Sequence, residues 1–140
     1  KTNQLENCTQ EEISNAYDNA ILYTDYFLSK AINFLKKYSK THEAGLLYVS
    51  DHGESLGENG IYLHGMPYAI APKAQTHVAS LIWLDDGQMA HEYDINKIKQ
   101  NKDKEYSHDN LFDTLLGLFE VKTEVYKKEL DILNEARKEH

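Results

Sequence analysis

A carboxylate and an imidazole stand side by side in this chain, directly after a strand-like run. Residues 46–49 read LLYV, and Ser50, Asp51, His52 and Gly53 follow them. In open α/β sheets the functional groups lie just beyond the carboxyl ends of the strands. A hard oxygen and a borderline nitrogen together suit zinc, which binds both at about 2.0–2.2 Å. Asp51 and His52 are therefore a candidate zinc pair, although an isolated Asp-His-Gly is more often a turn with a capping Asp.

The stretch after this pair has the composition of a functional loop rather than of a connector. Residues 54–68 contain three glycines, His64 and Pro67, and they show no sustained helical or strand period. Segments of this length without periodicity are uncommon inside compact domains, and they usually shape a site. Taken alone, His64 is best explained as a loop histidine bonded to the backbone.

The elements that must hold these residues are a long helix and two buried strands. Residues 9–12 (TQEE) form a capping box at the start of a helical period that continues to about Tyr38. Residues 46–50 and 78–84 have the apolar composition of interior strands. Residues 85–87 (DDG) then predict a turn.

The last third of the chain is predicted to be helical and charged. A short helix is expected near residues 94–100, and Ser107 is expected to cap a further helix. The apolar residues of that helix are expected to face the core; they are Leu111, Phe112, Leu115, Leu118 and Phe119. Residues 124–126 and 131–133 are expected to pack back on the domain, and residues 137–140 are expected to fray.

Composition excludes several classes of function. The 140 residues carry a formal net charge of −8, and the lysines between residues 97 and 104 alternate with acids and amides. A nucleic-acid-binding surface needs clustered Lys and Arg, so no nucleic acid is expected as a partner. No stretch has the apolar length of a transmembrane helix, and the first residues lack a signal-peptide pattern.

An extended motif resembles one known enzyme family. Residues 50–60 (SDHGESLGENG), with 62–65 (YLHG), Pro67-Tyr68 and Ala71-Pro72, are similar to the signature of the phosphoethanolamine transferases of the alkaline phosphatase and sulfatase superfamily. Residues 107–112 (SHDNLF) are a second match, and the likeness covers most of the chain. The resemblance implies an α/β fold, an alkaline-phosphatase-like α/β/α sandwich with a mostly parallel sheet.

The resemblance also implies a zinc-dependent transferase. In this family a zinc-activated threonine attacks the phosphorus of phosphatidylethanolamine, holds phosphoethanolamine as a covalent adduct and passes it to lipid A or another cell-envelope acceptor. Carried over by motif, Asp51 and His52 are zinc (Zn2+) ligands, and His64 faces the phosphoethanolamine group or a second metal. Such a histidine could donate a hydrogen bond to a phosphoryl oxygen or protonate a leaving oxygen.

By the same resemblance, residues 1–140 are the C-terminal portion of a single sulfatase-like catalytic domain and are inactive alone. The family's nucleophilic threonine and a glutamate ligand lie far upstream of the motif, while Thr9, Thr24 and Thr41 are expected in a helix cap, a helix and a turn. The remaining N-terminal part of the domain is therefore an expected partner, and it is expected to hold the disulfide partner of Cys8. The family is periplasmic and is attached to the bacterial inner membrane through an N-terminal region.

Two other functions stay open at this point. A sulfatase, a phosphodiesterase or a phosphoglycerol transferase of the same superfamily would share Asp51 and His52 but use another donor. A non-catalytic binding module would use residues 51–53 only as a turn and the long helix for association. Metal content separates the module from the enzymes, and the loop with His64 separates the transferase from its superfamily rivals.

Overall fold

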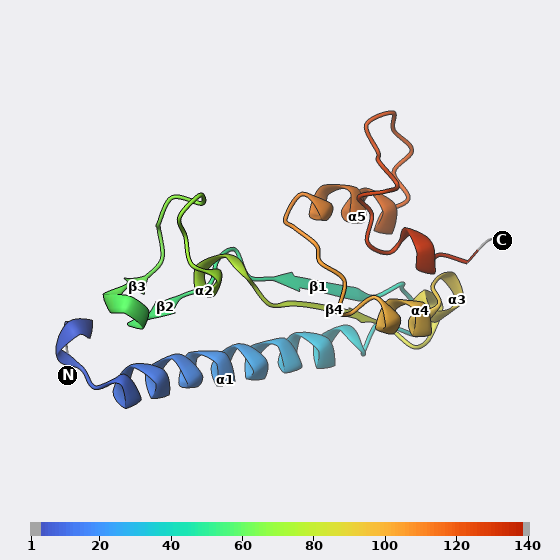
Figure 1. Ribbon diagram of the computed structural model, residues 1–140. Coiled ribbons are helices and arrows are strands. Elements are labelled where there is room, and N and C mark those ends of the chain that lie inside the picture. The colour runs from blue at the N-terminus through green and yellow to red at the C-terminus, as the bar shows by residue number, and fades with distance from the viewer. Residues whose placement is uncertain (1–3, 139–140) are drawn as a thin grey trace. The chain divides into compact units, whose positions relative to one another are not determined.

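The structure is a computed structural model that describes residues 4–138 (Figure 1). It divides into two compact units. The first unit contains residues 1–38 and 45–83, and the second contains residues 39–44 and 84–140. All three predicted site residues belong to the first unit.

The first unit combines one long helix with short strands. In chain order its elements are η1 (Leu5–Asn7), α1 (Gln10–Leu35), β1 (Gly45–Val49), β2 (Ser55–Leu56), η2 (Glu58–Gly60), β3 (Tyr62–Leu63), α2 (Lys73–Thr76) and β4 (Ser80–Leu84). The mixture of helices and strands agrees with the predicted α/β class, and the two predicted strands are found as β1 and β4.

The predicted capping box at the start of α1 is confirmed. The backbone N–H of Glu12 donates to Thr9 Oγ1 at 3.2 Å, and the backbone N–H of Thr9 donates to Glu12 Oε2 at 2.9 Å. The helix ends three residues before Tyr38. The backbone N–H groups of Lys37 and Tyr38 each donate to the carbonyl three positions earlier, which tightens the chain beyond α1 into turns.

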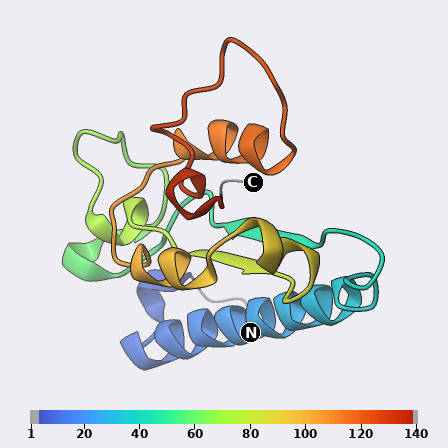
Figure 2. The same ribbon diagram turned by 90° about the vertical axis from the view of Figure 1, so that its right-hand side faces the viewer.

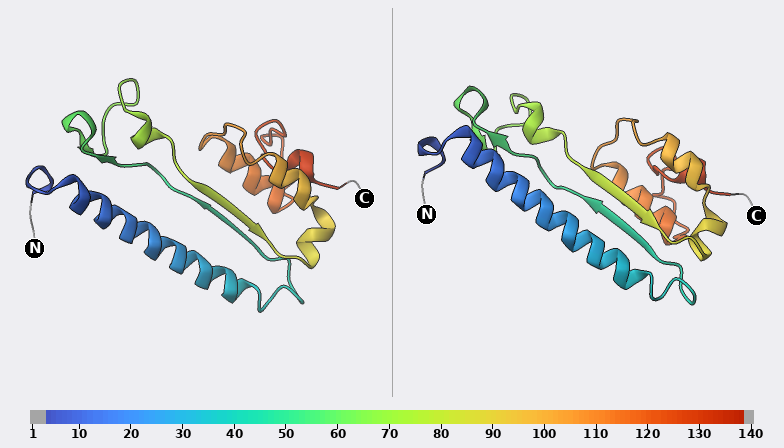
Figure 3. Two further views of the ribbon diagram at one scale, coloured as in Figure 1. Left: turned by 60° about the horizontal axis from the view of Figure 1, so that its bottom comes forward. Right: turned by 90° about the horizontal axis from the view of Figure 1, so that it is seen from below.

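The strands form two short sheets, in which β1 pairs with β4 and β2 pairs with β3. The arrows of β1 and β4 point in opposite directions in Figure 3. Hydrogen bonds from the Ser50 N–H to the Ala79 carbonyl and from the Asp85 N–H to the Ala44 carbonyl agree with an antiparallel pair. The parallel pairing expected for most of the sheet is therefore not represented by these two strands. Large α/β sheets commonly carry an antiparallel edge strand, so the fold class is unaffected.

A small hairpin of β2 and β3 occupies the segment that the sequence predicts as a loop. Ser55 is paired with Leu63, and Leu56 is paired with Tyr62. Gly57, which starts the turn, has a φ of 117°, a left-handed conformation that favours glycine. The pairing carries the chain back, so that the residue after Leu63 lies opposite the residue before Ser55.

The buried Gln75 of α2 fixes the segment that follows the hairpin. Its Nε2 donates to Ser55 Oγ at 2.9 Å, and its Oε1 accepts from the Met66 N–H at 3.3 Å. Its backbone carbonyl accepts from the Gly53 N–H at 2.9 Å. A Cβ at residue 53 would collide with the Ala74 carbonyl, so this close approach requires glycine. Gln75 therefore ties the end of β1 to the loop beyond β3.

The second unit consists of short helices and a long returning loop. Its helices are α3 (Gln88–Glu92), α4 (Ile95–Gln100), α5 (Asn110–Leu118) and the 3₁₀ turn η3 (Asn134–Ala136). Figure 2 shows the residues after α5 as a loop that returns to η3. Asp94 Oδ1 accepts from the N–H groups of Asn96 at 2.9 Å and Lys97 at 3.3 Å, so the short helix predicted near residues 94–100 is confirmed with Asp94 as its cap.

Asp85 has a structural role in the turn after β4. Its side chain is fully buried, and its carboxylate accepts from the Ala44 N–H at 2.8 Å and from the Gly87 N–H at 2.7 Å. The turn predicted at residues 85–87 is therefore confirmed. The acid satisfies two backbone donors that would otherwise stay unpaired.

Helix α5 buries polar rather than apolar side chains among the described residues. Phe112 and Phe119 were predicted to face the core but are exposed, whereas Asp113 and Thr114 are buried. Backbone N–H groups of the tail donate to both polar side chains, at 2.6 Å to Asp113 and at 3.1 Å to Thr114. The predicted core face of α5 is wrong here, because its polar residues serve the backbone of the returning tail. The helix also begins two residues later than a cap at Ser107 implies.

The tail packs around a buried carboxylate, Asp131. Its Oδ2 accepts from the Tyr126 hydroxyl at 2.8 Å and lies 3.6 Å from the Arg137 guanidinium, while its Oδ1 accepts from the Leu133 N–H at 2.9 Å. The predicted packing is confirmed for residues 131–133 and for Tyr126, but it is wrong for Val125, which is 59% exposed. The fraying predicted from residue 137 is wrong for Arg137, and residues 139–140 lie outside the described residues.

Candidate metal centre

The turn at the end of β1 fixes the orientation of His52. Ser50 Oγ donates to the His52 carbonyl at 2.8 Å, and the His52 N–H donates to Asp51 Oδ1 at 3.1 Å. His52 Nδ1 lies 3.0 Å from the Gly53 carbonyl, a distance at which an Nδ1–H donates to that oxygen. The lone pair of Nε2 is then the one that can bind a metal.

Asp51 and His52 remain close enough to bind one ion together. Asp51 Oδ2 lies 3.8 Å from His52 Nε2. Two ligands of a tetrahedral zinc, each about 2.0–2.1 Å from the ion, lie roughly 3.4 Å apart. The side chain of Asp51 is 90% exposed, so it has room for the small rotation that closes the difference.

His64 lies against His52, as the return of the hairpin requires. The two imidazole rings are stacked with their centroids 3.7 Å apart and their planes inclined by 28°. His64 Nδ1 lies 2.9 Å from Glu54 Oε1. A carboxylate on Nδ1 fixes the ring orientation and directs Nε2 toward any further ligand. The structure therefore brings His52 and His64 together with an acid that the sequence reasoning did not select.

Glu54 is the residue that sequence reasoning missed. One carboxylate oxygen contacts His64, while the other, Oε2, is buried and has no hydrogen-bond partner among the described residues. A buried carboxylate oxygen without a partner is costly, so this atom calls for a ligand. The only signal in the sequence was its position two residues after His52, inside the SDHGES motif.

These side chains form a possible metal-binding triad. His52, Glu54 and His64 each offer one ligand atom, and the three atoms lie within 4.8 Å of one another. Two imidazole nitrogens and one carboxylate oxygen are a donor set that occurs in catalytic zinc sites. The partnerless oxygen of Glu54 and this donor set fit a zinc ion, with Asp51 at the edge of the same cluster.

The three threonines weighed as possible nucleophiles are engaged locally. Thr9 takes part in the capping box, Thr24 Oγ1 donates to the Ala20 carbonyl at 3.0 Å, and Thr41 Oγ1 lies 2.8 Å from His42 Nδ1. These contacts agree with the positions expected for them, in a cap, a helix and a turn.

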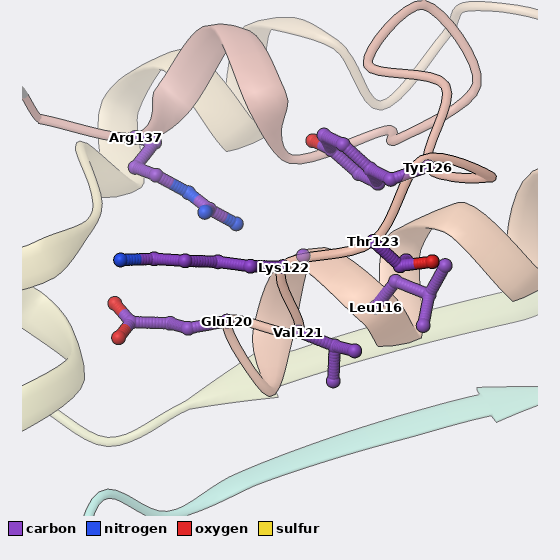
Figure 4. Close-up of a pocket in the computed structure, with 8 residues that line it drawn as sticks. Leu116, Glu120, Val121, Lys122, Thr123, Tyr126 and Arg137 are labelled. Atoms are coloured by element: carbon purple, nitrogen blue, oxygen red, sulfur yellow. The ribbon is translucent and has the colours of Figure 1, made fainter.

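A cavity of about 460 Å³ lies in the second unit. Figure 4 shows Lys122 and Glu120 extending on one side of it, with Arg137 and Tyr126 opposite. Its lining consists of Leu116, Gly117, Glu120, Val121, Lys122, Thr123, Tyr126 and Arg137. Since Arg137 and Tyr126 are held by Asp131, two walls of this cavity belong to the packing of the tail.

The sequence profile of the sulfatase family matches residues 1–121. This chain belongs to the sulfatase family. The α/β fold and the DHG motif at a strand end agree with that assignment.

Phosphoethanolamine transferases are among the relatives of the chain. Phosphoethanolamine transferase EptA of Escherichia coli is 51% identical over 139 residues, which are 98% of this chain and 25% of EptA. Phosphatidylethanolamine transferase Mcr-1 of Escherichia coli is 43% identical over 125 residues, or 89% of this chain and 22% of Mcr-1. The chain thus spans about a quarter of the length of these relatives. They confirm the resemblance to phosphoethanolamine transferases.

Solved structures of such enzymes share the fold. The C-terminal periplasmic domain of phosphoethanolamine transferase EptC from Campylobacter jejuni matches with a TM-score of 0.86 and 55% identity, over 95% of this chain and 41% of that domain. The soluble domain of lipooligosaccharide phosphoethanolamine transferase A from Neisseria meningitidis matches with a TM-score of 0.93 and 45% identity, over 99% of this chain and 42% of that domain. The predicted alkaline-phosphatase-like fold is therefore confirmed. Within residues 4–138, no helix has the length and apolar character needed to cross a membrane.

Proposed function

We propose that this chain contributes zinc ligands and a phosphate-facing histidine to a phosphoethanolamine transferase. The reaction would move phosphoethanolamine from phosphatidylethanolamine to lipid A or another cell-envelope acceptor through a phospho-threonine. The observation that carries the proposal is the gathering of His52, Glu54 and His64 beside Asp51, inside the extended motif. The 51% identity to EptA supports the same activity over the matched region.

The remaining N-terminal part of the catalytic domain would supply the nucleophilic threonine and a glutamate ligand. The share of the relatives that this chain spans, about a quarter, supports such an upstream part. The names of two solved relatives, a periplasmic domain and an integral membrane protein, support a periplasmic site of action at the inner membrane. The same upstream part is where a disulfide partner of Cys8 would lie.

Asp51 and His52 would hold the zinc ion of the reaction, as the motif implies. Bound zinc lowers the pKa of a hydroxyl and offsets charge on phosphoryl oxygens. The 3.8 Å between Asp51 Oδ2 and His52 Nε2 supports this pairing. Glu54, whose Oε2 has no partner among the described residues, would either complete the ligand set or hold it in place.

His64 would face the phosphoethanolamine group. Its Nδ1 is engaged by Glu54, so its Nε2 is the atom left to face the phosphate, and it would donate a hydrogen bond to a phosphoryl oxygen when the ring carries both protons. Glu54 would fix the ring for this task, because a carboxylate on Nδ1 sets the orientation of the ring. The stacking on His52 would keep the phosphate-facing atom close to the metal ligands.

Substitution of His64 tests this function. In the full-length gene product, His64→Ala should lower transfer from fluorescent phosphatidylethanolamine to lipid A by about 10²–10³-fold, as for loss of one donor to a developing charge. Zinc content should remain, because this proposal assigns the ion to Asp51 and His52 and not to His64. His77→Ala is the matched control, because this exposed histidine lies outside the cluster, and it should preserve both transfer and zinc.

Three results would redirect the proposal. Full transfer by His64→Ala would remove the histidine from the reaction. Absence of both zinc and transfer in the parent protein would favour a non-catalytic binding module. Hydrolysis of sulfate esters or phosphodiesters without transfer would favour another enzyme of the superfamily. Both of these matched relatives are named transferases, which favours phosphoethanolamine transfer over the two alternative functions.

A further inference from the structure

An apolar loop follows directly after His64 and is exposed. Residues 65–72 read GMPYAIAP and carry no charge. The side chains of Tyr68 and Ile70 are 87% and 65% exposed. Figure 1 shows this loop, in light green between β3 and α2, extending away from the strands of its own unit. Large apolar side chains gathered at an exposed tip mark an interaction surface.

The loop is held in this conformation by hydrogen bonds. The Met66 N–H donates to Gln75 Oε1 at 3.3 Å, and the Ile70 N–H donates to the Pro67 carbonyl at 2.9 Å, closing a turn at the tip. Gly65 enters the loop with a φ of 101°, which favours glycine. The exposure of Tyr68 is therefore a property of an ordered turn.

The charge around the loop differs from that of the rest of the chain. The chain has 23 acidic residues and a net charge of −8, yet residues 65–76 contain none of the acids. Lys73, which is exposed, follows the apolar tip directly. An apolar tip with a tyrosine and an adjacent lysine is suited to a phospholipid surface, since the aromatic ring prefers the headgroup level and the ammonium attracts phosphate.

We propose that residues 65–72 dip into the phospholipid surface and present the lipid headgroup to the adjacent His64. Tyr68 and Ile70 enter the boundary between headgroups and acyl chains, and Lys73 lies at the level of the phosphates. This inference rests on the proposed function, in which the donor is a phospholipid. The occupant is the lipid surface rather than another protein segment, because residues 65–76 contain no acid, Lys73 follows the uncharged loop, and the loop begins directly after the phosphate-facing His64.

A tryptophan placed at the tip tests the insertion directly. Ala69 is exposed, so Ala69→Trp adds a fluorophore without replacing either anchoring side chain. The full-length variant is reconstituted into vesicles of brominated phosphatidylethanolamine, and the fluorescence of the parent protein is subtracted. The added emission should shift to the blue and be quenched by about twofold or more, as for a side chain at the acyl boundary. Lys99→Trp, on an exposed position of α4, is the control and should stay unquenched.

Two spectroscopic outcomes overturn the inference. Red-shifted added emission that brominated lipid leaves unquenched means that the tip stays in water. Blue-shifted added emission that brominated lipid leaves unquenched means that another protein segment covers the tip.

A kinetic comparison separates this inference from the proposed function. In Tyr68→Ser/Ile70→Ser, kcat/KM for a donor in vesicles should fall about tenfold relative to kcat/KM for a short-chain donor below its micellar concentration, because only the first is reached through the surface. Val125→Ser, an exposed apolar residue of the second unit, should leave that ratio unchanged. An unchanged ratio in the double variant overturns the loop proposal. Absence of transfer from either donor, with the tryptophan still quenched, overturns the proposed function instead.

Discussion

Asp131 and Glu54 both contact a basic side chain, but their carboxylate oxygens differ in how many hydrogen-bond partners they have. Asp131 in the second unit is fully enclosed, and both of its oxygens have partners: the Leu133 N–H on one, the Tyr126 hydroxyl and the Arg137 guanidinium on the other. Glu54 in the first unit has one oxygen on His64 and one buried oxygen with no partner among the described residues. The first carboxylate completes a network, and the second leaves one incomplete.

The comparison separates a packing role from a ligand-binding role. A buried charge with all its hydrogen bonds made stabilises one arrangement of its neighbours, here the return of the tail to α5. A buried oxygen left without a donor costs free energy until a cation or donor reaches it. The types of residue around a carboxylate do not by themselves distinguish the two roles. The number of its oxygens that have a hydrogen-bond partner does.

Removal of either predicted zinc ligand should have the largest effect. Asp51→Ala and His52→Ala should each lower transfer to background, because the ion loses a direct ligand at the end of β1. The fold should persist in both, since the two residues lie in the turn after the end of β1. Zinc content by mass spectrometry and circular dichroism check the two parts. Unaltered zinc in both variants would contradict the assignment.

Removal of Asp131 should instead destabilise the fold. Asp131→Ala leaves Arg137 without its counter-charge and Tyr126 without its acceptor, so the free energy of unfolding should fall by about 3–5 kcal/mol. Urea denaturation measures this. If Asp131 is a packing residue and not part of the metal site, Asp131→Ala should bind as much zinc per folded molecule as the parent protein. A loss of zinc without a loss of stability would reverse the roles of the two clusters.

Neutralising Glu54 should affect metal affinity more than stability. Glu54→Gln keeps the shape and a hydrogen bond to His64 but removes the charge, so zinc affinity should weaken by about 10–100-fold. Competition with a chelator of known affinity gives the number. The unfolding midpoint without metal should stay close to that of the parent, and a large fall in it would show that Glu54 is a packing residue like Asp131.

The smallest effect is expected at Tyr126, and it should depend on pH. Burial, followed by the hydrogen bond to the Asp131 carboxylate, raises the pKa of Tyr126 to about 12. The folded state therefore favours the protonated phenol. This stabilisation is complete below pH 10 and is lost as pH rises through about 12. Tyr126→Phe should cost about 1 kcal/mol at neutral pH and flatten the fall of stability between pH 10 and pH 12. Unfolding free energies across that range check it, and an equally steep fall in Tyr126→Phe would assign the pH dependence to another group.

Local sequence patterns correctly predicted those elements whose structure depends on neighbouring residues rather than on long-range contacts. The capping box, the buried run that ends at Ser50 and the turn at residues 85–87 each depend on neighbours within a few positions. The proximity of Glu54 and His64 does not. It arises from the register of β2 with β3 across ten residues, which a polar, glycine-rich segment without strand periodicity does not reveal.

The same reasoning explains the wrong prediction for α5. Its apolar residues have helical spacing, and nothing local shows that Asp113 and Thr114 will serve backbone groups of a tail more than ten residues away. Polar residues buried through such distant partners look like surface residues in the sequence. The burial of such an acid can therefore be recognised only from the three-dimensional structure.

Gly53 links the end of β1 to the apolar loop. Because it has no side chain, the Ala74 carbonyl can approach it closely. Gln75, which follows Ala74, then forms hydrogen bonds with the Ser55 hydroxyl and the Met66 N–H. One added methyl group would push on the whole arrangement, although residue 53 contacts no metal or lipid. Laboratory evolution should therefore retain glycine at residue 53 and reject even alanine, while the exposed tip of the loop stays open to substitution.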